Sequence, residues 1–586
     1  MFSLQTPCLK FPFLRLFSIT LLTVCVQAKA IETKIDPVNT LSNHPSPYLA
    51  MHAEDPVHWQ PWNTLTLRHA QQDNRPLLIS SGYFACHWCH VMQKENYQDP
   101  DAAEIMNRFF VPVKIDRELN PDLDNYLIDF SRRVTGKAGW PQHVVLTPKG
   151  YPFAAFGYLP NTNYKRTLID LSELWKTQSK RIRSLAETTS TKQTASKSIS
   201  LQEFRSLLLQ HLDQSLDDLS GGLKGSHKFP QMPLILSLLE QNSLSETQQA
   251  WLELTFDQMQ SQHLIDHING GFYRYTVDPE WQTPHFEKMG YDNALLAKAY
   301  FVAGHKFHNN RYLKTAEDTL HYMEKHLYSP KLGLFKSSQS ALDKQGREGG
   351  NYLFNRKQLR QKLSTTAFKE AEHLWRLDQP APYELGWHPS PTMEHWAEIK
   401  TTLQATVTDI PSDDKYILGW NGLTLSAYVS AYEAVGQKDY LIKAQQLANR
   451  LIDLLNQPEP PKALTGDAKY IGHASLEDYA YVIQGLQSLQ RVAPDNTLQE
   501  GIQALTESTL RRFLNKQGWQ TSTDFLLPGQ NRFIALKDTA TPSPSALLEC
   551  STDDRGEKRN AGFADLLRQN PLDFASYLIA LECQTD

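Results

Sequence analysis

The chain has 586 residues, which is too long for one hydrophobic core and predicts two or more domains. Hydrophobic residues make up 40% of it and charged residues 21%, a composition that excludes a disordered or fibrous protein. The net charge of −5, without a Lys/Arg-rich stripe, argues against nucleic acid as a partner.

The first 30 residues have the pattern of a signal peptide. Lys10 and Arg15 precede an apolar run over residues 16–26, which is followed by Ala28-Lys29-Ala30. A charged start, a short apolar run and an A-x-A site are typical of exported proteins. We therefore expect cleavage near Ala30 and a periplasmic or secreted protein. No later segment is long and apolar enough for a membrane span, so we do not expect an integral membrane protein.

The cysteines of the mature chain are too few for a disulfide scaffold. Cys25 lies within the signal peptide, and its acylation, the lipoprotein alternative, is disfavoured because the bulky Val24 precedes it. Cys550 and Cys583 can be paired or unpaired, since sequence does not give their separation. After cleavage four cysteines remain, Cys86, Cys89, Cys550 and Cys583.

Residues 40–180 have an α/β pattern. Short apolar runs predict strands, and a helical pattern separates the first two of them. Strands that alternate with helices in this way indicate βαβ units. The predicted strands are 76–80, 111–116, 143–147 and 152–158, and the helical pattern ends over 102–109.

The stretch FACHWCHVM, residues 84–92, follows the first predicted strand and runs into a helical pattern. A helix N-terminus stabilises a thiolate, because its free N–H groups and its dipole both favour negative charge. We therefore predict that Cys86 is the attacking nucleophile and Cys89 the resolving thiol. A histidine that can charge would favour the thiolate further, so we expect His87 and Trp88 to contribute to the site.

The pair Trp140-Pro141 supports a redox site. It directly precedes the third predicted strand, where a cis-proline typically faces the dithiol in thioredoxin-like folds. Sequence does not show the isomer, because most X-Pro bonds are trans. We expect Pro141 to form part of the catalytic site and Trp140 to contact the substrate.

Two other kinds of site, for c-type haem and for zinc, match the sequence of this motif. Cys86-His87-Trp88-Cys89-His90 matches C-x-x-C-H, the attachment pattern of c-type haem, in which His90 would be the axial ligand. C-x-x-C is also half of a zinc signature, but a second ligand pair is missing. The strand before the motif and the helix after it favour the dithiol. We therefore expect a redox-active disulfide, without a metal or a further cofactor, over c-type haem.

The polar stretch ETTSTKQTASKSI, residues 187–199, predicts an interdomain linker. After it, strand patterns nearly vanish and apolar residues recur at helical spacing. Glycine- and aromatic-rich loops separate the helical segments, which indicates stacked hairpins. A closed ring would gather these loops at one mouth, and an open solenoid is the alternative. The helical segments are 201–217, 233–259, 290–306, 312–327, 357–375, 421–436, 440–456, 476–491 and 498–514.

Long, ordered motifs in both parts of the chain resemble the spermatogenesis-associated protein 20 family. The N-terminal motifs are HPSPYLAMHAEDPVHWQPW (44–62), PLLISSGYFACHWCHVM, NRFFVPVKIDRELNPDLD (107–124) and TGKAGWP (135–141). The later motifs are GGFYRYTVDPEWQTPHFEKMGYDNALLA (270–297), SDDKYILGWNGLTLSA (412–427) and LEDYAYVIQGL (476–486). The resemblance implies a thioredoxin-like domain and a second domain similar to the six-hairpin α/α barrels of sugar epimerases and glycosidases.

The patterns and the resemblance together predict the following organisation. An α/β thioredoxin-like N-terminal domain is followed by an all-α (α/α)6 toroid. The predicted parts are a signal peptide over 1–30, the thioredoxin-like domain over 31–186, the linker over 187–199 and the barrel domain over 200–586.

The chain departs from the family pattern at two places in the second domain. The family's Asp-Ala-Asp is missing from SSQSALDKQGREGGNYLF, residues 337–354, where Arg347-Glu348-Gly349 remains and only Asp343 lies nearby. Gly290 stands where a bulky residue is customary. Both departures bear on any chemistry that the barrel performs in other members.

The loop PHFEKMGYDN offers candidate catalytic residues in the second domain. His285 and Glu287 could serve as acid and base at a sugar carbon, and Glu287 with Asp478 could cleave a glycosidic bond. The alternative is that such residues cap helices and join loops, since the helix dipole alone favours acids near a helix start. Further candidates for substrate binding are Arg274, Asp292, Trp420, Asn421, Asp478 and Tyr479.

The leading hypothesis is an exported thiol–disulfide oxidoreductase fused to a carbohydrate-active-like helical barrel. Its partner would be a protein or small-molecule thiol or disulfide, with a carbohydrate as a further candidate ligand. One alternative places a sugar epimerase, isomerase or glycosidase in the barrel, regulated by the thioredoxin-like domain. Another is a sugar-binding protein without catalysis.

Overall fold

The computed structural model describes residues 38–189, 198–391, 394–407, 409–516, 518–523, 526–528, 535–549 and 564–582. The predicted signal peptide and the cysteines Cys550 and Cys583 lie outside these residues, so neither prediction is tested. Both predicted domains belong to one continuous unit, residues 37–586.

The N-terminal domain is built on a four-stranded mixed sheet with the order β2-β1-β3-β4. The strands β1 and β2 are parallel, whereas β3 runs antiparallel to both β1 and β4. In β1, β2 and β3 every residue is buried, which fits strands covered on both faces. All four strands predicted from the sequence are present: β1 Leu77–Gly82, β2 Val111–Asp116, β3 Gln142–Leu146 and β4 Pro152–Phe156.

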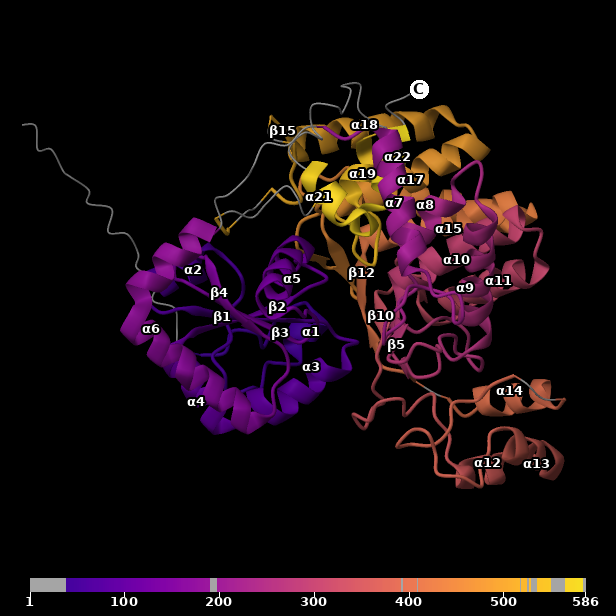
Figure 1. The fold of residues 1–586 in the computed structure, drawn as a ribbon, viewed down its shortest axis with the longest axis horizontal. Helices are drawn as coiled ribbons and strands as arrows, with labels where there is room; N and C mark the ends of the chain where they lie inside the picture. Colours follow the sequence, from indigo (N-terminus) through magenta and orange to yellow (C-terminus); the bar gives the residue numbers. More distant parts are fainter. Residues whose placement is uncertain are drawn as a thin grey trace, which may run out of the picture. The chain divides into compact units, whose positions relative to one another are not determined.

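Helices cover both faces of this sheet (Figure 1). The helix α4 packs against α6, and α5 packs on β3 and β4. The last helix, α6, continues to Thr189 and so enters the stretch predicted as a linker, of which residues 190–197 are not described. The helices are α1 Pro47–Ala50, α2 Thr64–Gln72, α3 His87–Met92, α4 Pro100–Phe109, α5 Pro121–Thr135 and α6 Asn161–Thr189.

The second domain contains six helical pairs in its described residues. Five consecutive contacts join the second helices of these pairs: α8 to α10, then α15, α17, α19 and α22. The pairs are α7 Leu201–Ser215 with α8 Met232–Leu239, α9 Glu246–Ser261 with α10 Gly290–Lys306, α11 Asn310–His326 with α15 Leu418–Val435, α16 Lys438–Leu455 with α17 Leu476–Val492, α18 Asn496–Phe513 with α19 Pro544–Glu549, and α21 Ala564–Gln569 with α22 Tyr577–Glu582.

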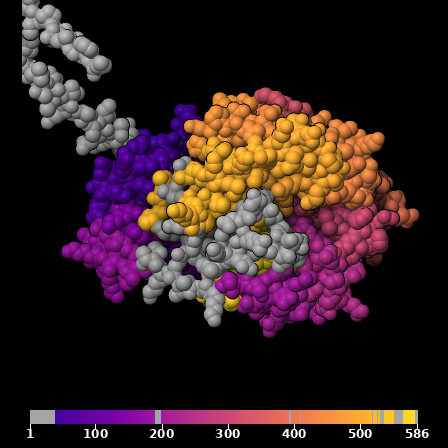
Figure 2. All heavy atoms as spheres, turned by 90° about the horizontal axis from the view of Figure 1, so that it is seen from above, coloured from indigo at the N-terminus to yellow at the C-terminus, as the bar shows by residue number. Residues whose placement is uncertain are grey.

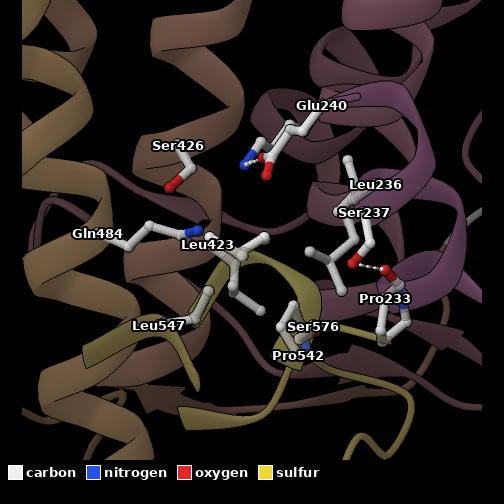
Figure 3. Close-up of a pocket in the computed structure, with 13 residues that line it drawn as sticks. Pro233, Leu236, Ser237, Glu240, Leu423, Ser426, Gln484, Pro542, Leu547 and Ser576 are labelled. Atoms are coloured by element: carbon white, nitrogen blue, oxygen red, sulfur yellow. Dashed lines mark hydrogen bonds and ion pairs between the residues drawn. The ribbon is translucent and has the colours of Figure 1, made fainter. Parts of the chain in front are cut away.

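The ring of inner helices is closed. Residues from all six inner helices, or from the turns that lead into them, line one central cavity. Figure 3 shows the leucines Leu236, Leu423 and Leu547 around it. Its volume is about 10 Å³, which is room for about one water molecule and not for a sugar ring. The predicted (α/α)6 toroid is therefore confirmed. At the height of this cavity, side chains fill the centre of the ring.

Burial explains which helices lie inside the ring. In α15 the fourteen residues from Leu418 to Ala431 are all buried, and α10 is buried around nearly its whole circumference. The outer helices α11 and α16 instead bury one face and expose the other. A helix that is apolar all round must be enclosed, whereas an amphipathic helix can face water.

Short strands and an extra helical segment interrupt the ring. Several loops form two- or three-residue ladders that the sequence did not predict, such as β7 Lys288–Met289 with β10 Ser338–Gln339. Between α11 and α15 the helices α12 Arg356–Lys362, α13 Thr365–Leu374 and α14 Trp396–Gln404 share a small core of their own. None of the described helices is both long and apolar enough to cross a lipid bilayer.

A buried charged cluster joins the two domains. Lys415, on the barrel strand β12 Lys415–Ile417, places its Nζ 2.6 Å from Asp116 Oδ2 at the end of β2. The same Nζ lies 3.0 Å from Glu118 Oε2 and 2.6 Å from Asp413 Oδ2, and all four side chains are fully buried. We call this the Lys415 cluster. It brings the barrel loops against the carboxyl ends of β1 and β2, directly before the cysteine motif.

The C-terminal residues also contact the first domain. Figure 2 shows orange-to-yellow residues beside the indigo ones. Lys537 Nζ lies 3.2 Å from Asp129 Oδ1 of the first domain. Leu527 joins the core of the thioredoxin-like domain.

Candidate functional site at the junction of the two domains

Cys86 is the N-cap of α3. Its backbone is extended, and its Sγ accepts a hydrogen bond of 3.1 Å from the N–H of Cys89. Cys86 and Cys89 form a disulfide. The predicted placement of the motif between a strand and a helix is therefore confirmed. The ring of His90 is engaged elsewhere, with Nε2 2.8 Å from the carbonyl oxygen of Phe84.

The Trp140–Pro141 peptide bond is cis. The indole of Trp140 packs edge-on against Tyr83, three residues before Cys86, with 5.8 Å between ring centroids. Its Nε1 donates to Asp124 Oδ1 at 3.0 Å. The two predicted parts of the redox site thus lie on the same face of the thioredoxin-like domain.

Barrel loops reach this face and contact the cysteine motif. The N–H of Ala341 donates to the carbonyl of Ala85 at 3.4 Å. The carboxylate of Glu348 lies between two histidines, with Oε1 3.1 Å from His285 Nδ1 and Oε2 3.4 Å from His87 Nε2. His285 and His87, predicted as parts of two separate sites, therefore share one carboxylate.

The two histidines differ in their electrostatics. Burial lowers the pKa of His87, and its neighbour Glu348 only partly opposes this effect. Burial also acts on His285, but the hydrogen bond to Glu348 and the charge of Glu287 outweigh it and raise the pKa of His285. For Glu348, the cost of burial is exceeded by the two histidines, which lower the pKa of the carboxyl. The histidine that favours a charge here is His285, whereas the sequence suggested His87.

Glu287 and Arg274 also reach across to the thioredoxin-like domain. The Tyr83 hydroxyl donates to Glu287 Oε2 at 2.6 Å and accepts from Arg274 Nη1 at 2.5 Å. Arg274 Cζ lies 5.1 Å from the ring centroid of Trp140, and Arg117 Cζ lies 4.1 Å from it. We call these five residues, together with Tyr291 and Asp292, the Arg274 cluster.

The Arg274 cluster contains buried polar atoms without a hydrogen bond. Among the described residues these are Arg117 Nη1, Arg274 Nε, Tyr291 Oη and Asp292 Oδ2, whose contacts are too poorly aligned for regular hydrogen bonds although the groups shift one another's pKa. Burial is the main cause that raises the pKa of Asp292 to about 7. Unpaired buried polar atoms are rare in folded proteins, and they commonly mark water, ligand or functional positions.

Two of the predicted sugar-binding residues make structural contacts within the barrel. Asp478 accepts from the N–H of Gly419 at 2.9 Å and pairs with Lys462 at 2.9 Å. The amide of Asn421 exchanges hydrogen bonds with the backbone of Phe335, at 2.8 and 3.1 Å. These contacts match the alternative in which polar residues cap helices and join loops.

The remaining predicted residues pack through their rings. Trp420 lies against Tyr291, with 4.7 Å between centroids, and Tyr479 lies against Phe513 at 5.6 Å. Trp88 is 41% exposed and packs at a tilt against Tyr158 of its own domain, with 5.0 Å between ring centroids.

The departures from the family pattern have local explanations. Gly290 donates its N–H to the carbonyl of Ser337 at 2.7 Å, and a Cβ there would lie 3.0 Å from the carbonyl oxygen of Lys336. A bulky residue therefore has no room at this position. Asp343 pairs with Arg347 and accepts backbone N–H groups of its own loop, which shapes the turn that presents Glu348.

Sequence reasoning did not select Tyr83, Arg117, Glu348 and Lys415. Tyr83 and Glu348 lie inside motifs that were noted, but an aromatic residue or a single acid has no distinctive spacing. Arg117 and Lys415 stand in VKIDRELN and SDDKYILG, where charges follow short strands. Arg117 contacts Tyr83 and Trp140, and Lys415 pairs with Asp116 and Glu118 of the other domain, so these partners are distant in sequence and no local pattern indicates them.

Comparison with known proteins confirms the predicted family resemblance. The family model Thioredox_DsbH, described as a protein of unknown function, DUF255, matches residues 38–194. Spermatogenesis-associated protein 20 from Homo sapiens is 28% identical over 559 residues, which cover 82% of this chain and 70% of the relative.

Two solved structures are similar to parts of the chain. A D-mannose isomerase covers 63% of this chain and 85% of its own length, at 13% identity and a TM-score of 0.42. A DsbH oxidoreductase covers 20% of this chain and 85% of its own length, at 21% identity and a TM-score of 0.17.

Proposed function

We propose, from the premise that this chain resembles the spermatogenesis-associated protein 20 family along most of its length, that its N-terminal domain is a thiol–disulfide oxidoreductase. Cys86 is the nucleophile and Cys89 the resolving cysteine. The observation that carries the proposal is the position of Cys86 at the N-terminus of α3, where its Sγ accepts the N–H of Cys89.

This position supports the proposed chemistry through electrostatics. When the disulfide is reduced, the hydrogen bond to Cys86 Sγ and the partial positive charge of the helix N-terminus favour the thiolate over the thiol. Cys89 is fully buried and has no such cap. The two sulfurs therefore differ in nucleophilicity, as an attacking and a resolving cysteine must.

The proposal predicts different behaviour of the two single-cysteine variants. Cys89→Ser, reduced and then mixed with excess glutathione disulfide, should accumulate a stable mixed disulfide on Cys86, because no resolving thiol remains. Cys86→Ser should form at least about tenfold less adduct at Cys89, which is buried and uncapped. Intact mass and peptide mapping measure the adducts and separate them from any at Cys550 or Cys583.

Wild-type protein carried through the same steps is the control, and it should return to the Cys86–Cys89 disulfide without a lasting adduct. Equal adducts on both variants would overturn the assignment of roles. A disulfide that resists reduction by excess dithiothreitol in folded protein would overturn the proposed activity itself.

We also propose that the protein is exported, as its N-terminal pattern suggests. Disulfides persist in oxidising compartments, so export fits an oxidised Cys86–Cys89 pair. Mass spectrometry of the mature N-terminus tests this proposal. A chain that begins at Ile31 supports cleavage after Ala30, and a retained Met1 contradicts it.

A further inference from the structure

The Cys86–Cys89 pair lies almost entirely beneath other residues. Only 2% of Cys86 is exposed, and none of Cys89. Exchange proceeds by attack of a thiolate on a disulfide sulfur, so the partner's sulfur must reach Cys86 Sγ. Reactive cysteines in proteins are usually partly exposed. What covers this pair therefore determines which partners can react with it.

Barrel loops supply part of this cover. The backbone bond from Ala341 to Ala85 places the barrel directly beside the residue that precedes Cys86. Arg274 lies over both Tyr83 and Trp140, and its Cζ is 5.3 and 5.1 Å from their ring centroids. A folded protein that approached the dithiol face would have to displace these loops.

The docking of the barrel over this face is held by buried charges. The Lys415 cluster joins the end of β2 to β12, and its four side chains are fully buried. Separating the domains would leave Asp116 and Glu118 without their cation, while Lys415 would keep only Asp413, so spontaneous opening is costly.

Partly exposed side chains lie beside Cys86, on the side from which the sulfur of a reaction partner could reach its Sγ. Next to Cys86, the side chain of His87 is 17% exposed, and that of Glu348, which it contacts, is 31% exposed. Trp88 follows and is more exposed still. Glu348 belongs to the barrel, and His87 and Trp88 belong to the thioredoxin-like domain. The approach is therefore bordered by both domains, which limits the size of any partner.

We infer that the substrate of the Cys86–Cys89 pair is a low-molecular-weight disulfide or thiol, and that the docked barrel excludes the disulfides of folded proteins. This inference rests on the proposed oxidoreductase activity and narrows its substrate class.

The exchange balances without a further reactant. In the reduced protein the Cys86 thiolate attacks one sulfur of a small disulfide RS–SR, forms the mixed disulfide Cys86–S–SR and releases RS⁻. Cys89, after losing its proton to solvent, attacks Cys86 Sγ and releases the second RS⁻. Two electrons pass from the dithiol to the substrate, and the protein returns to the disulfide seen in the structure. Two molecules of a small thiol drive the reverse sequence.

Parallel rate measurements on the reduced full-length protein test the inference. The protein is mixed with glutathione disulfide or with insulin at equal disulfide concentration, and its reoxidation is followed by acid quenching and thiol alkylation. Each rate is divided by the rate of a free small thiol with the same disulfide, which removes differences in intrinsic reactivity. The normalised rate should be at least about 100-fold higher for glutathione disulfide, which corresponds to about 3 kcal/mol of opening free energy.

A variant in which the barrel docks less tightly tests whether this docking excludes the disulfides of folded proteins. Lys415→Ala should raise the normalised insulin rate at least about tenfold and leave the glutathione disulfide rate within about threefold. Asp116→Asn, which removes one interdomain ion pair and leaves Lys415 paired with Asp413, serves as a second variant in case Lys415→Ala does not fold.

The outcomes separate the inference from the activity on which it rests. A high rate with glutathione disulfide and a low rate with insulin supports both. Equal normalised rates, or a preference for insulin, contradict the inferred substrate class but not the proposed oxidoreductase activity. No reaction with either disulfide overturns the proposed activity, and the inference with it.

Discussion

The two buried charged clusters that join the domains differ in how their charges are arranged. In the Lys415 cluster, one cation lies within 3.0 Å of a carboxylate oxygen from each of Asp116, Glu118 and Asp413. In the Arg274 cluster, two arginines lie beside Tyr83, Glu287 and Asp292, and the Tyr83 hydroxyl donates to Glu287 and accepts from Arg274. The first cluster therefore shares one cation among three acids, whereas the second sets two cations beside two acids and a hydroxyl.

Removing the cation of the Lys415 cluster should have the largest effect. Lys415→Ala leaves three buried carboxylates without their counter-charge, and this should lower the free energy of unfolding by about 3–5 kcal/mol. Urea unfolding followed by tryptophan fluorescence measures the loss. Lys336→Ala, which removes a more exposed ion pair with Asp414, is the matched control and should cost less than about 1 kcal/mol. Similar losses for the two variants would show that burial does not distinguish this cluster.

Asp292→Asn tests the Arg274 cluster through its pH dependence. In the folded protein the pKa of Asp292 is raised to about 7, against about 4 in an unfolded chain, so the folded state binds more protons between these values. The contribution of Asp292 is therefore fully present below pH 4 and is lost as pH rises toward 7. Asn cannot ionise, so the variant should gain stability relative to wild type across this window. The gain should reach a few kcal/mol, since each pKa unit corresponds to about 1.4 kcal/mol.

Urea midpoints at pH 4.5 and pH 8 measure this relative gain. Asp318→Asn, at an exposed ion pair with Lys314, is the control and should show little change between the two pH values. A pH-independent difference between Asp292→Asn and wild type would mean that the carboxyl of Asp292 is ionised throughout, and that this cluster resembles the Lys415 cluster after all.

The exposed contact between the domains should have the smallest effect. Lys537 lies 3.2 Å from Asp129 and 3.3 Å from Asp573, and all three side chains are partly exposed. Lys537→Ala should therefore cost less than about 1 kcal/mol, and 1 M sodium chloride should abolish the difference. A loss as large as that of Lys415→Ala would contradict the view that buried charges, rather than surface pairs, hold the domains together.

Much of the fold could be predicted because its signals are local. The strands of the first domain are short apolar runs between turn residues, and the helices of the barrel repeat apolar residues at helical spacing. The motif around Cys86 follows a strand and precedes a helix within a dozen residues, so its place in the fold was also predictable. The small strands between barrel loops were missed, because two or three residues have no measurable period.

The sequence predicted the cysteine pair and the barrel loop as two separate sites. Cys86 and Cys89 were selected from their own spacing, and His285 and Glu287 from a polar loop 200 residues later. That Glu348 would join His285 to His87 was not predictable, because neither local pattern refers to the other domain. Asp478 and Asn421 look equally functional in the sequence, yet their side chains form hydrogen bonds with backbone groups of the barrel.

The sequence by itself determined the α/β and all-α parts of the chain and the position of the cysteines at a helix N-terminus, because periodicity, turn residues and capping act over a few residues. Closure of the second part into a ring was expected only from the family resemblance. Only the tertiary structure decided that a barrel loop bonds to the residue before Cys86 and that His87 and His285 share the carboxylate of Glu348. Those features depend on buried charges such as Lys415 and Asp116, which are 299 residues apart. Their mutual attraction becomes strong only where both domains exclude water from them.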